Sequence, residues 1–279
     1  MTRIARSHPR FRSLLQRARL ARAAREGLVV PEGLIAQGRA EAFDYLLGEQ
    51  TTPSARRAIH HAALWLAAAE HPVVSVNGNV AALGALEVAR LARALPALRV
   101  EVNLFHRTPR RARQVAEALR RAGVREVLGV VPDARIRNLA SDRSRVDVRG
   151  IYRADVCLVP LEDGDRTRAL RAEGKRVISV DLNPLSRTSR DASLPIIDEL
   201  TRTLRGLIGE LPRARREARA GQFPPFDAEG ARAEAVQTIS RRLARAARGQ
   251  QRRSWPRERE PRASSPRRGG TGRLRRRTP

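Results

Sequence analysis

Short apolar runs alternate with amphipathic stretches through the middle of the chain. Each run is rich in β-branched side chains and is apolar at consecutive rather than alternate positions, which is typical of strands buried on both faces of a parallel sheet. The runs cover residues 73–76, 98–102, 126–131, 156–159 and 176–180. They predict the strands of one parallel sheet.

The amphipathic stretches between these runs predict helices that cross from one strand to the next. They cover residues 80–95, 109–122 and 166–172. The second stretch has clear end signals, because Thr108 can cap it, Pro109 suits its first turn and Gly123 follows its end. Alternation of this kind predicts an α/β fold with a Rossmann-like parallel sheet flanked by helices.

Helical patterns also stand on both sides of this central region. Three helices are expected before it, over residues 10–25, 37–47 and 52–69, and two after it, from 197 to about 211 and from 228 to 248. The last residues mix Arg, Pro, Ser and Gly and cannot bury enough apolar surface to order themselves. We therefore expect an N-terminal helical segment at 1–71, a catalytic core at 72–220, a helical extension at 221–250 and a disordered basic tail at 251–279.

The formal net charge of +27 would suit a protein that binds nucleic acid. Residues 251–279 hold eleven arginines and two glutamates, so this tail alone supplies +9 of that charge. Aromatic residues make up only 3% of the chain, and no basic stretch of the body alternates with the aromatic side chains that stack on bases. A small anionic substrate is therefore favoured, and nucleic acid is expected only as a non-specific partner of the tail.

The sequence gives no sign of export or of a membrane span. It has no apolar run long enough to cross a bilayer, and its first residues are rich in arginine without the apolar stretch of a secretory signal. Its single cysteine, Cys157, lies in an apolar run and has no partner for a disulfide or a thiolate metal site. We expect a cytoplasmic protein.

A polar cluster follows each predicted strand. These clusters are Asn77-Gly78-Asn79, Asn103, Asp133 with Arg135, Glu162 to Thr167, and Asp181 to Thr188. The carboxyl ends of parallel strands open on one edge of the sheet, where α/β proteins bind their ligands. The clusters therefore predict one ligand-binding rim.

The chemistry of each cluster has more than one interpretation. Asn77-Gly78-Asn79 suits either a turn with a helix cap or backbone N–H groups that approach an anion, and no Walker P-loop or complete G-x-G-x-x-G motif is present. Glu162, Asp163 and Asp165 suit either an exposed loop or a site for Mg²⁺ or a substrate ammonium group. Arg187 stands among Asn, Ser and Thr donors and is a candidate for binding a phosphate group.

Eight segments, in order and without large gaps between Ser7 and Leu211, resemble archaeal phosphopantothenate synthetase, also called 4-phosphopantoate:β-alanine ligase. They are SHPR from residue 7, GLIAQGR from 33, EAFDYLLGE from 41, SVNGNVAA from 75, EVNLF from 101, PDARI from 132, ADVCLVPLEDGDRT from 154 and DLNPLSRT from 181. The resemblance implies a homodimeric enzyme of coenzyme A biosynthesis that joins 4-phosphopantoate to β-alanine. It also implies that ATP and Mg²⁺ are used and that an acyl-adenylate forms, with release of pyrophosphate and then AMP.

The resemblance also implies which residues bind the substrates. The implied ATP contacts are Arg17, Arg39, Asp181, Leu182, Asn183, Arg187, Thr188, Asp198 and Glu199. Position on the predicted rim suggests a further set for substrate binding or catalysis, namely Asn77, Asn79, Asn103, Asp133, Arg135, Asp163 and Asp165, with Asp163 and Asp165 as candidate metal ligands. Gln37 and Ala40 depart from the histidine and glycine expected in the family, and Glu199 stands in place of an expected asparagine.

Two other functions agree with parts of the sequence. An α/β nucleic-acid-binding protein would use the tail and the surface arginines to contact phosphates. A different acyl-adenylate ligase on the same scaffold would join another acid to another amine. Salt-sensitive binding to RNA or DNA would support the first alternative, and pyrophosphate release with other carboxylates would support the second.

Overall fold

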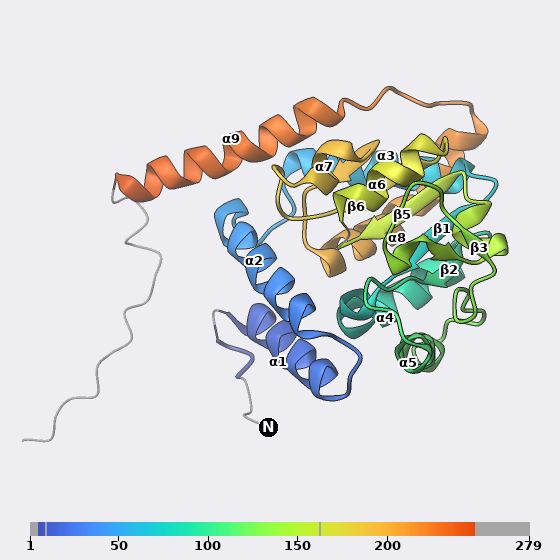
Figure 1. Ribbon diagram of the computed structural model, residues 1–279. Coiled ribbons are helices and arrows are strands. Elements are labelled where there is room, and N and C mark those ends of the chain that lie inside the picture. The colour runs from blue at the N-terminus through green and yellow to red at the C-terminus, as the bar shows by residue number, and fades with distance from the viewer. Residues whose placement is uncertain (1–4, 9, 162, 249–279) are drawn as a thin grey trace, which may run out of the picture. The chain divides into compact units, whose positions relative to one another are not determined.

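The computed structural model describes residues 5–8, 10–161 and 163–248 (Figure 1). Glu162 and the tail predicted to be disordered at 251–279 lie outside the described residues. The chain divides into two units between Leu243 and Ala244. The architecture below is that of the first unit, which contains the sheet and the site.

Helices and strands alternate along this unit as the sequence pattern predicts. The α-helices are α1 (Phe11–Arg25), α2 (Pro31–Leu47), α3 (Pro53–Ala68), α4 (Gly78–Ala94), α5 (Pro109–Arg121), α6 (Gly164–Ala172), α7 (Arg187–Asp191), α8 (Leu200–Arg219) and α9 (Ala228–Ala247), the last of which runs on into the second unit. The strands are β1 (Pro72–Val76), β2 (Arg99–Val102), β3 (Ala134–Arg135), β4 (Arg145–Val146), β5 (Val156–Pro160), β6 (Arg176–Val180) and β7 (Leu194–Ile196). A 3₁₀ turn, η1 (Asp142–Ser144), and a π-helical turn, η2 (Val148–Tyr152), flank β4.

The main sheet has five strands in the order β2-β1-β5-β6-β7, and all neighbouring pairs are parallel. This order confirms the Rossmann-like α/β fold. The chain extends the sheet from β1 to β2 in one direction and then adds β5 on the other side of β1. The direction of winding therefore reverses between β1 and β5, and the crevice at such a reversal is where doubly wound proteins bind ligands.

Two strand predictions were wrong. Residues 126–131 do not form a strand, because only Leu128 pairs with the edge strand β2, and Gly129 then turns the chain with a left-handed φ of 74°. The strand β7 was missed, since it is three residues long and contains Pro195. A proline can stand in this strand because β7 lies at the edge of the sheet, where one side needs no hydrogen-bond donor.

Helix boundaries differ from prediction mainly where packing outweighs a local signal. The prediction ended α8 near Leu211 because Pro212 lacks an N–H group, but the helix continues through Pro212 to Arg219. Leu207, Leu211 and Ala214 form one continuous buried face across the proline. Burial of this face offsets the lost hydrogen bond and keeps the helix intact.

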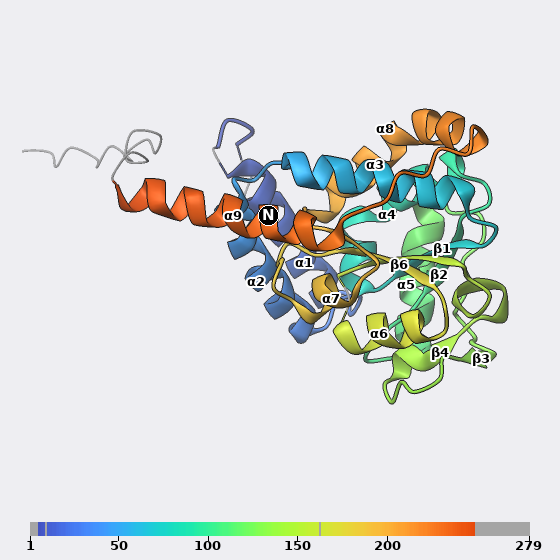
Figure 2. The same ribbon diagram turned by 90° about the horizontal axis from the view of Figure 1, so that it is seen from above.

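The two faces of the sheet are covered unequally, as Figure 2 shows with α3 and α8 on one side and α6 with β3 and β4 on the other. Side chains alternate along β5, so that Leu158 joins the larger core with α3, α4, α5 and α8, whereas Cys157 and Val159 join the smaller core on the α6 side. The segment 133–152, which we call the β3–η2 segment, completes the smaller core through Ile136, Val146 and Ile151.

Candidate active site

The side chain of Asn77 links the ends of β1 and β5, where the winding of the sheet reverses. Its carbonyl oxygen accepts from the backbone N–H of Val80 at 3.0 Å and so caps α4. Its amide nitrogen donates to the carbonyls of Pro160 and Leu161, at 3.2 and 3.0 Å. One buried asparagine therefore joins the ends of the two strands and fixes where α4 begins.

Glycines allow other chain segments to approach this point closely. A Cβ atom on Gly78 would lie 2.3 Å from the carbonyl oxygen of Leu28, and one on Gly164 would lie 2.4 Å from the Cβ of Arg187. These distances are shorter than any real Cβ contact, so only glycine lets α4 and α6 begin where they do. The N-termini of both helices, whose N–H groups favour anions, thus open on the same space.

That space is a cavity of about 670 Å³. Its walls come from the ends of β1 and β5, the loops before α6 and α7, and one side of α2. The helix α2 is held over the opening by Asn79, whose side chain donates to the carbonyl of Gly33 at 2.8 Å. The polar or charged side chains in the wall are those of Glu32, Gln37, Arg39, Asn77, Asn79, His106, Arg111, Arg143, Asp163, Asp181, Asn183, Ser186, Arg187 and Thr188.

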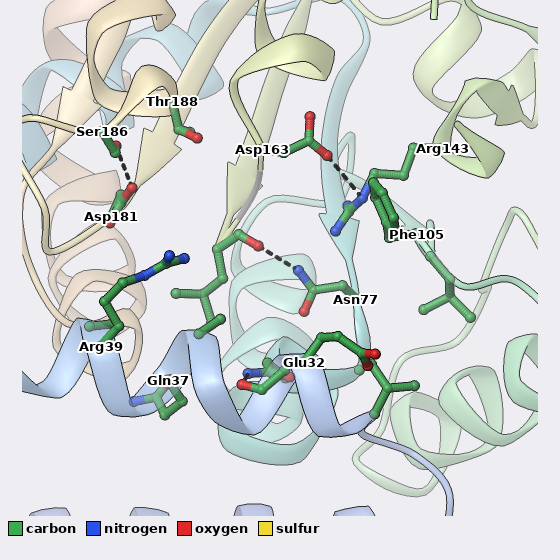
Figure 3. Close-up of a pocket in the computed structure, with 18 of the residues that line it drawn as sticks. Glu32, Gln37, Arg39, Asn77, Phe105, Arg143, Asp163, Asp181, Ser186 and Thr188 are labelled. Atoms are coloured by element: carbon green, nitrogen blue, oxygen red, sulfur yellow. Dashed lines mark hydrogen bonds and ion pairs between the residues drawn. The ribbon is translucent and has the colours of Figure 1, made fainter. Parts of the chain in front are cut away.

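Four guanidinium groups line this cavity and come from four different parts of the chain. Figure 3 shows Arg39 from α2 on one side and Arg143 from η1 on the other, with Asn77 between them. Arg111 donates to the carbonyls of His106 and Leu28, and burial lowers the pKa of its guanidinium group. Arg187 forms an exposed ion pair with Asp165 at 3.0 Å.

The carboxylates of the cavity are engaged in local contacts. Asp163 caps α6 through the N–H of Arg166 at 2.9 Å, and its other oxygen lies 3.5 Å from Nε of Arg143. Asp181 accepts from the hydroxyl of Ser186 at 2.5 Å and from the N–H of Asn183 at 2.9 Å. Burial raises the pKa of Asp181, and these two hydrogen bonds and the charge of Arg39 oppose that rise.

The cavity brings together eight of the residues that were predicted from sequence. They are Arg39, Asn77, Asn79, Asp163, Asp181, Asn183, Arg187 and Thr188. They belong to three of the five polar clusters on the predicted rim and to α2, and they are far apart in the chain. Helices and loops of the rim thus converge around one volume that can hold a small polyanion.

The other predicted residues do not line this cavity, and most have a structural contact. Asn103 is fully buried and donates to the carbonyls of Arg143 and Arg145. Asp133 accepts from the N–H of Val148, and Arg135 is exposed on β3. Asp165 faces Arg187 from outside, Leu182 packs in a small apolar cluster, and Arg17 forms an ion pair with Glu41 at 2.8 Å.

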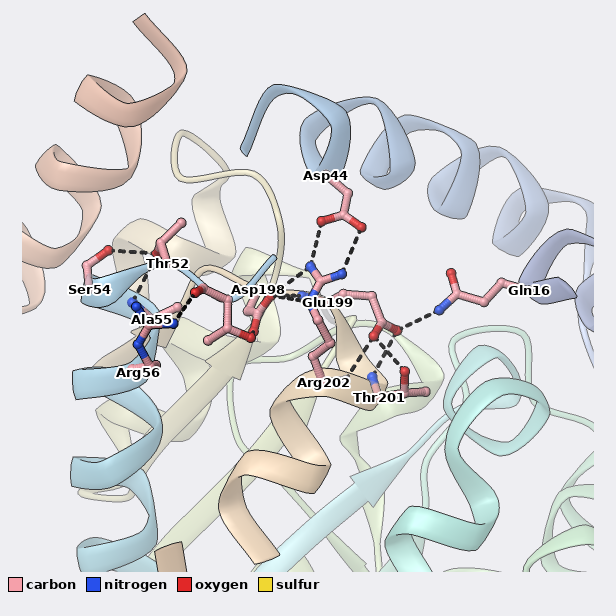
Figure 4. Close-up of polar contacts among 11 residues, drawn as sticks. Gln16, Asp44, Thr52, Ser54, Ala55, Arg56, Asp198, Glu199, Thr201 and Arg202 are labelled. Carbon is pink, nitrogen blue, oxygen red and sulfur yellow. Dashed lines mark hydrogen bonds and ion pairs between the residues drawn. The ribbon is translucent and has the colours of Figure 1, made fainter. Parts of the chain in front are cut away.

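Asp198 and Glu199 belong to a separate polar cluster, drawn in Figure 4. Arg202 donates to both oxygens of Asp44, at 3.1 and 2.5 Å, and to Asp198 at 2.9 Å. Asp198 also accepts from the hydroxyl of Thr51, and Glu199 caps α8 through the N–H groups of Thr201 and Arg202. This cluster links α2 to the start of α8. The oxygens of its acids already accept hydrogen bonds from groups of the protein.

Sequence reasoning missed two cationic residues of the site, Arg111 and Arg143. Arg111 lies on α5, where nothing in the sequence distinguishes it from the other arginines of that helix. Arg143 lies in the β3–η2 segment, which has no regular apolar period, and it comes twelve residues after the predicted strand at 126–131. The wall residue Phe105 lies under Arg143, with the guanidinium carbon 6.0 Å from the centre of its ring.

The described residues give no sign of a protein-built metal centre or of a membrane span. No three His, Cys, Asp or Glu side chains in this part of the chain come together as metal ligands would. No helix among the same residues is long and apolar enough to cross a bilayer.

A doubly wound sheet with a cationic cavity at its point of reversal defines the class of α/β proteins that bind phosphate-bearing small molecules. Comparison with known proteins gives the family. The sequence model of the phosphopantothenate/pantothenate synthetase family matches residues 54–242, and the chain belongs to this family.

Relatives in several archaea cover most of the chain. A 4-phosphopantoate--beta-alanine ligase of Methanosarcina mazei is 47% identical over 246 residues, which are 87% of this chain and 96% of that protein. Proteins of the same name from Methanospirillum hungatei and Thermococcus kodakarensis are 55% and 51% identical, each over 72% of this chain and over 82% and 77% of their own lengths.

Proposed function

We propose that this protein is a ligase of coenzyme A biosynthesis that condenses 4-phosphopantoate with β-alanine at the expense of ATP. The products would be 4′-phosphopantothenate, AMP and pyrophosphate. Family membership and the names of relatives that are about half identical support the substrates. The observation that carries the proposal is the cavity at the reversal between β1 and β5, because its wall combines four guanidinium groups with two helix N-termini.

The charge of the cavity suits the first step of such a reaction. In this step the carboxylate of phosphopantoate attacks the α-phosphorus of ATP, and pyrophosphate leaves. Both reactants are anions, so cations must offset their repulsion before the reacting atoms can meet. Holding two reactants in line can be worth about 7–11 kcal/mol, which is more than general acid–base catalysis usually contributes.

We assign the nucleotide to the side of the cavity formed by α2 and the loop before α7. This side holds Arg39, Asp181, Asn183, Arg187 and Thr188, which are the implied ATP contacts that line the cavity. Arg17, Leu182, Asp198 and Glu199 would act on the nucleotide indirectly, since each contacts an element that borders the cavity. Arg17, for example, holds α2 through Glu41.

In the second step the amine of β-alanine attacks the acyl carbon, and AMP leaves. The amine enters as an ammonium ion, which a carboxylate at the cavity wall can attract, and it loses a proton to that carboxylate or to water before its lone pair attacks. We assign this role to Asp163, since it lines the cavity and its side chain is 31% exposed. Asp165 is less suited to it because it lies outside the wall and faces Arg187.

The residues present do not form a cage for Mg²⁺. The two candidate ligands, Asp163 and Asp165, both face guanidinium groups, and no third acid or histidine in the described chain completes a site. We therefore derive no step from a protein-bound metal. Mg²⁺ stays a prediction as a companion of the ATP phosphates, which supply the oxygen ligands that this ion prefers.

The test of the proposed function is AMP formation from ATP by the purified protein. AMP should accumulate when phosphopantoate and β-alanine are both present, and omission of β-alanine should stop steady turnover. Pantoate and other short carboxylates serve as alternative acids, and other ω-amino acids as alternative amines. Folded protein that forms no AMP with the complete mixture would overturn the proposal.

The acyl-adenylate can be tested separately with a heavy-oxygen label. Phosphopantoate labelled in its carboxylate should transfer one labelled oxygen to AMP, because the acyl–oxygen bond to phosphorus forms first and the acyl carbon is later attacked by the amine. Label found in inorganic phosphate instead would indicate an acyl-phosphate. The homodimer implied by the family resemblance is part of the same proposal, and sedimentation equilibrium would measure it.

A further inference from the structure

We propose that Glu101 and Asn103 are positioning residues of the ligase. From one face of the sheet they hold the β3–η2 segment, and through it they place Arg143 beside Asp163 in the cavity wall. This inference rests on the proposed function. It concerns how the wall keeps its shape, and it assigns no substrate to Arg143.

Two polar side chains stand on a buried face of the sheet at β2. Val100 and Val102 belong to the larger core, so Glu101 and, just beyond the strand, Asn103 point to the opposite face. Both are 0% exposed. A buried carboxylate is costly, and an apolar side chain would fill the same space without that cost. The presence of an acid and an amide here therefore has a reason other than packing.

The two side chains hold the backbone of the β3–η2 segment at four points. Glu101 accepts from two N–H groups, one just before η2 and one within it, at 3.1 and 2.6 Å. Asn103 donates to the carbonyls of Arg143 and Arg145, at 3.1 and 3.2 Å. The strand within this stretch, β4, is two residues long. The stretch therefore depends on β2 for its position more than on secondary structure of its own.

Two glycines let the backbone pass close enough to Glu101 for these bonds. A Cβ atom on Gly150 would lie 2.0 Å from Oε2 of Glu101, and one on Gly129 would lie 2.6 Å from Cγ of the same side chain. Gly129 also has a left-handed φ of 74°, which a residue with a side chain rarely adopts. The chain on both sides of Glu101 is thus fitted to this side chain, as expected if the contact is required.

The residue that the segment brings to the site is Arg143. It lies in η1, is 7% exposed and lines the cavity. Its Nε lies 3.5 Å from a carboxylate oxygen of Asp163, and its guanidinium carbon lies 6.0 Å from the ring centre of Phe105 (Figure 3). Asp163 in turn caps α6, whose N-terminus opens on the cavity. A shift of the segment would therefore displace a cation of the wall and change the surroundings of the carboxylate beside it.

Glu101 and Asn103 contribute position rather than contact with a substrate. Both lie behind the residues that form the cavity wall. A displacement of about 1 Å in an active site can lower a rate about 100-fold. Loss of either anchor should therefore lower turnover, although every residue of the wall is still present.

The test is a double-mutant cycle on kcat for AMP formation, with wild type, Glu101→Gln, Arg143→Met and the double variant. Glu101→Gln replaces one of the two accepting oxygens, so we expect kcat to fall about 10-fold, and about 100-fold in Arg143→Met. Because Glu101 acts through Arg143, the double variant should be about as active as Arg143→Met alone. Independent effects would instead multiply, to a loss of about 1000-fold.

Lys175→Met is the matched control for a general loss of stability. Lys175 is buried and donates to the carbonyls of Tyr152 and Ala154, at 2.7 and 3.2 Å. Its loss frees the far end of η2 and leaves the bonds of Glu101 and Asn103 in place. This variant should unfold at a lower temperature than wild type and keep kcat within about twofold.

The outcomes separate this inference from the proposed function. Wild type that forms no AMP overturns the proposed function and this inference with it. In an active enzyme, effects of Glu101→Gln and Arg143→Met that multiply overturn the inference alone, as does full activity of either variant. An equal loss of kcat in Lys175→Met would show that Glu101 acts through general stability and would also overturn it. If Glu101→Gln does not fold, Asn103→Leu, which keeps the shape without the donor, takes its place in the cycle.

Discussion

Two clusters of arginines and acids both include residues of α2 and use the same types of side chain differently. In the cluster around Arg202, both oxygens of Asp44 and one of Asp198 accept hydrogen bonds from a single guanidinium group (Figure 4). In the cavity, Arg39 and Arg143 lie on opposite sides of an open volume, and Asp163 approaches Arg143 only at 3.5 Å (Figure 3).

The two clusters differ in their ratio of cations to carboxylates. Around Arg202 one cation is bonded to two acids, Asp44 and Asp198, and the contacts fix α2 against α8, so this cluster stabilises the fold. In the cavity the guanidinium groups exceed the carboxylates, four to three among the wall residues. This ratio of cations to carboxylates beside two helix N-termini favours an anionic ligand. The first cluster should therefore affect stability and the second should affect activity.

The largest expected effect is on stability, from Arg202→Met. This change leaves Asp198, whose side chain is 1% exposed, and Asp44 without their cation. Loss of one partner from a buried ion pair costs about 3–5 kcal/mol, and we expect a fall of that size in the free energy of unfolding measured with urea. If Arg202→Met were as stable as wild type, the claim that this cluster stabilises the fold would be wrong.

Glu101 extends the comparison to a third kind of site. This buried acid has backbone N–H groups as hydrogen-bond partners rather than a guanidinium group. Burial raises its pKa to about 7 from an ordinary value of 4.5. Its contribution to stability is therefore present below about pH 4.5 and is lost as the pH rises through 7. Glu101→Gln cannot ionise, and its amide nitrogen replaces one of the two oxygens that accept from these N–H groups.

We thus expect the stability of Glu101→Gln relative to wild type to rise by about 3 kcal/mol between pH 5 and pH 9, whatever the lost hydrogen bond costs at both pH values. Urea unfolding of both proteins across this range measures the difference. A constant difference at all pH values would show that Glu101 does not titrate in this way. Asp133→Asn, at an exposed acid of the same region, serves as a control.

Arg39→Met tests the other side of the comparison. Arg39 is exposed at the cavity wall, so its loss should change the free energy of unfolding by less than about 0.5 kcal/mol. Loss of one charge-assisted contact to the triphosphate should raise the KM for ATP in AMP formation about 10- to 100-fold. An unchanged KM for ATP would remove Arg39 from the site.

The smallest effect on stability is expected from Arg187→Met. Arg187 and Asp165 form an ion pair in which both side chains are more than half exposed, 57% and 59%. Such pairs contribute about 0–1 kcal/mol, so thermal unfolding should hardly change. A loss comparable with that of Arg202→Met would show that the two clusters do not differ as described.

The fold was predictable because strands and helices are set by local apolar patterns. Four of the five sheet strands follow from apolar runs, and Asn77, Thr108 and Asp163 cap helices near the predicted starts. β7 and the bridge at Leu128 were not predictable, because a three-residue strand and a single paired residue depend on the neighbouring strand rather than on their own sequence.

The site was predictable where it follows directly from strand ends. Asn77, Asp163 and Asp181 stand just after β1, β5 and β6, so the topology brings them together. Arg39 came only from the family resemblance, since α2 lies over the site through tertiary contacts such as that of Asn79 with Gly33. Neither the strand ends nor the family resemblance indicated Arg143, because the position of the β3–η2 segment depends on buried contacts with Glu101 and Asn103.

The most direct test of the central claim is a crystal structure of the protein with phosphopantoate and an ATP analogue whose α,β-bridging oxygen is a methylene group, which blocks the first step. We predict that the analogue and the acid both occupy the cavity at the β1–β5 reversal, with the triphosphate against Arg39. A nucleotide bound against Asp198 and Glu199, with the cavity empty, would contradict this account.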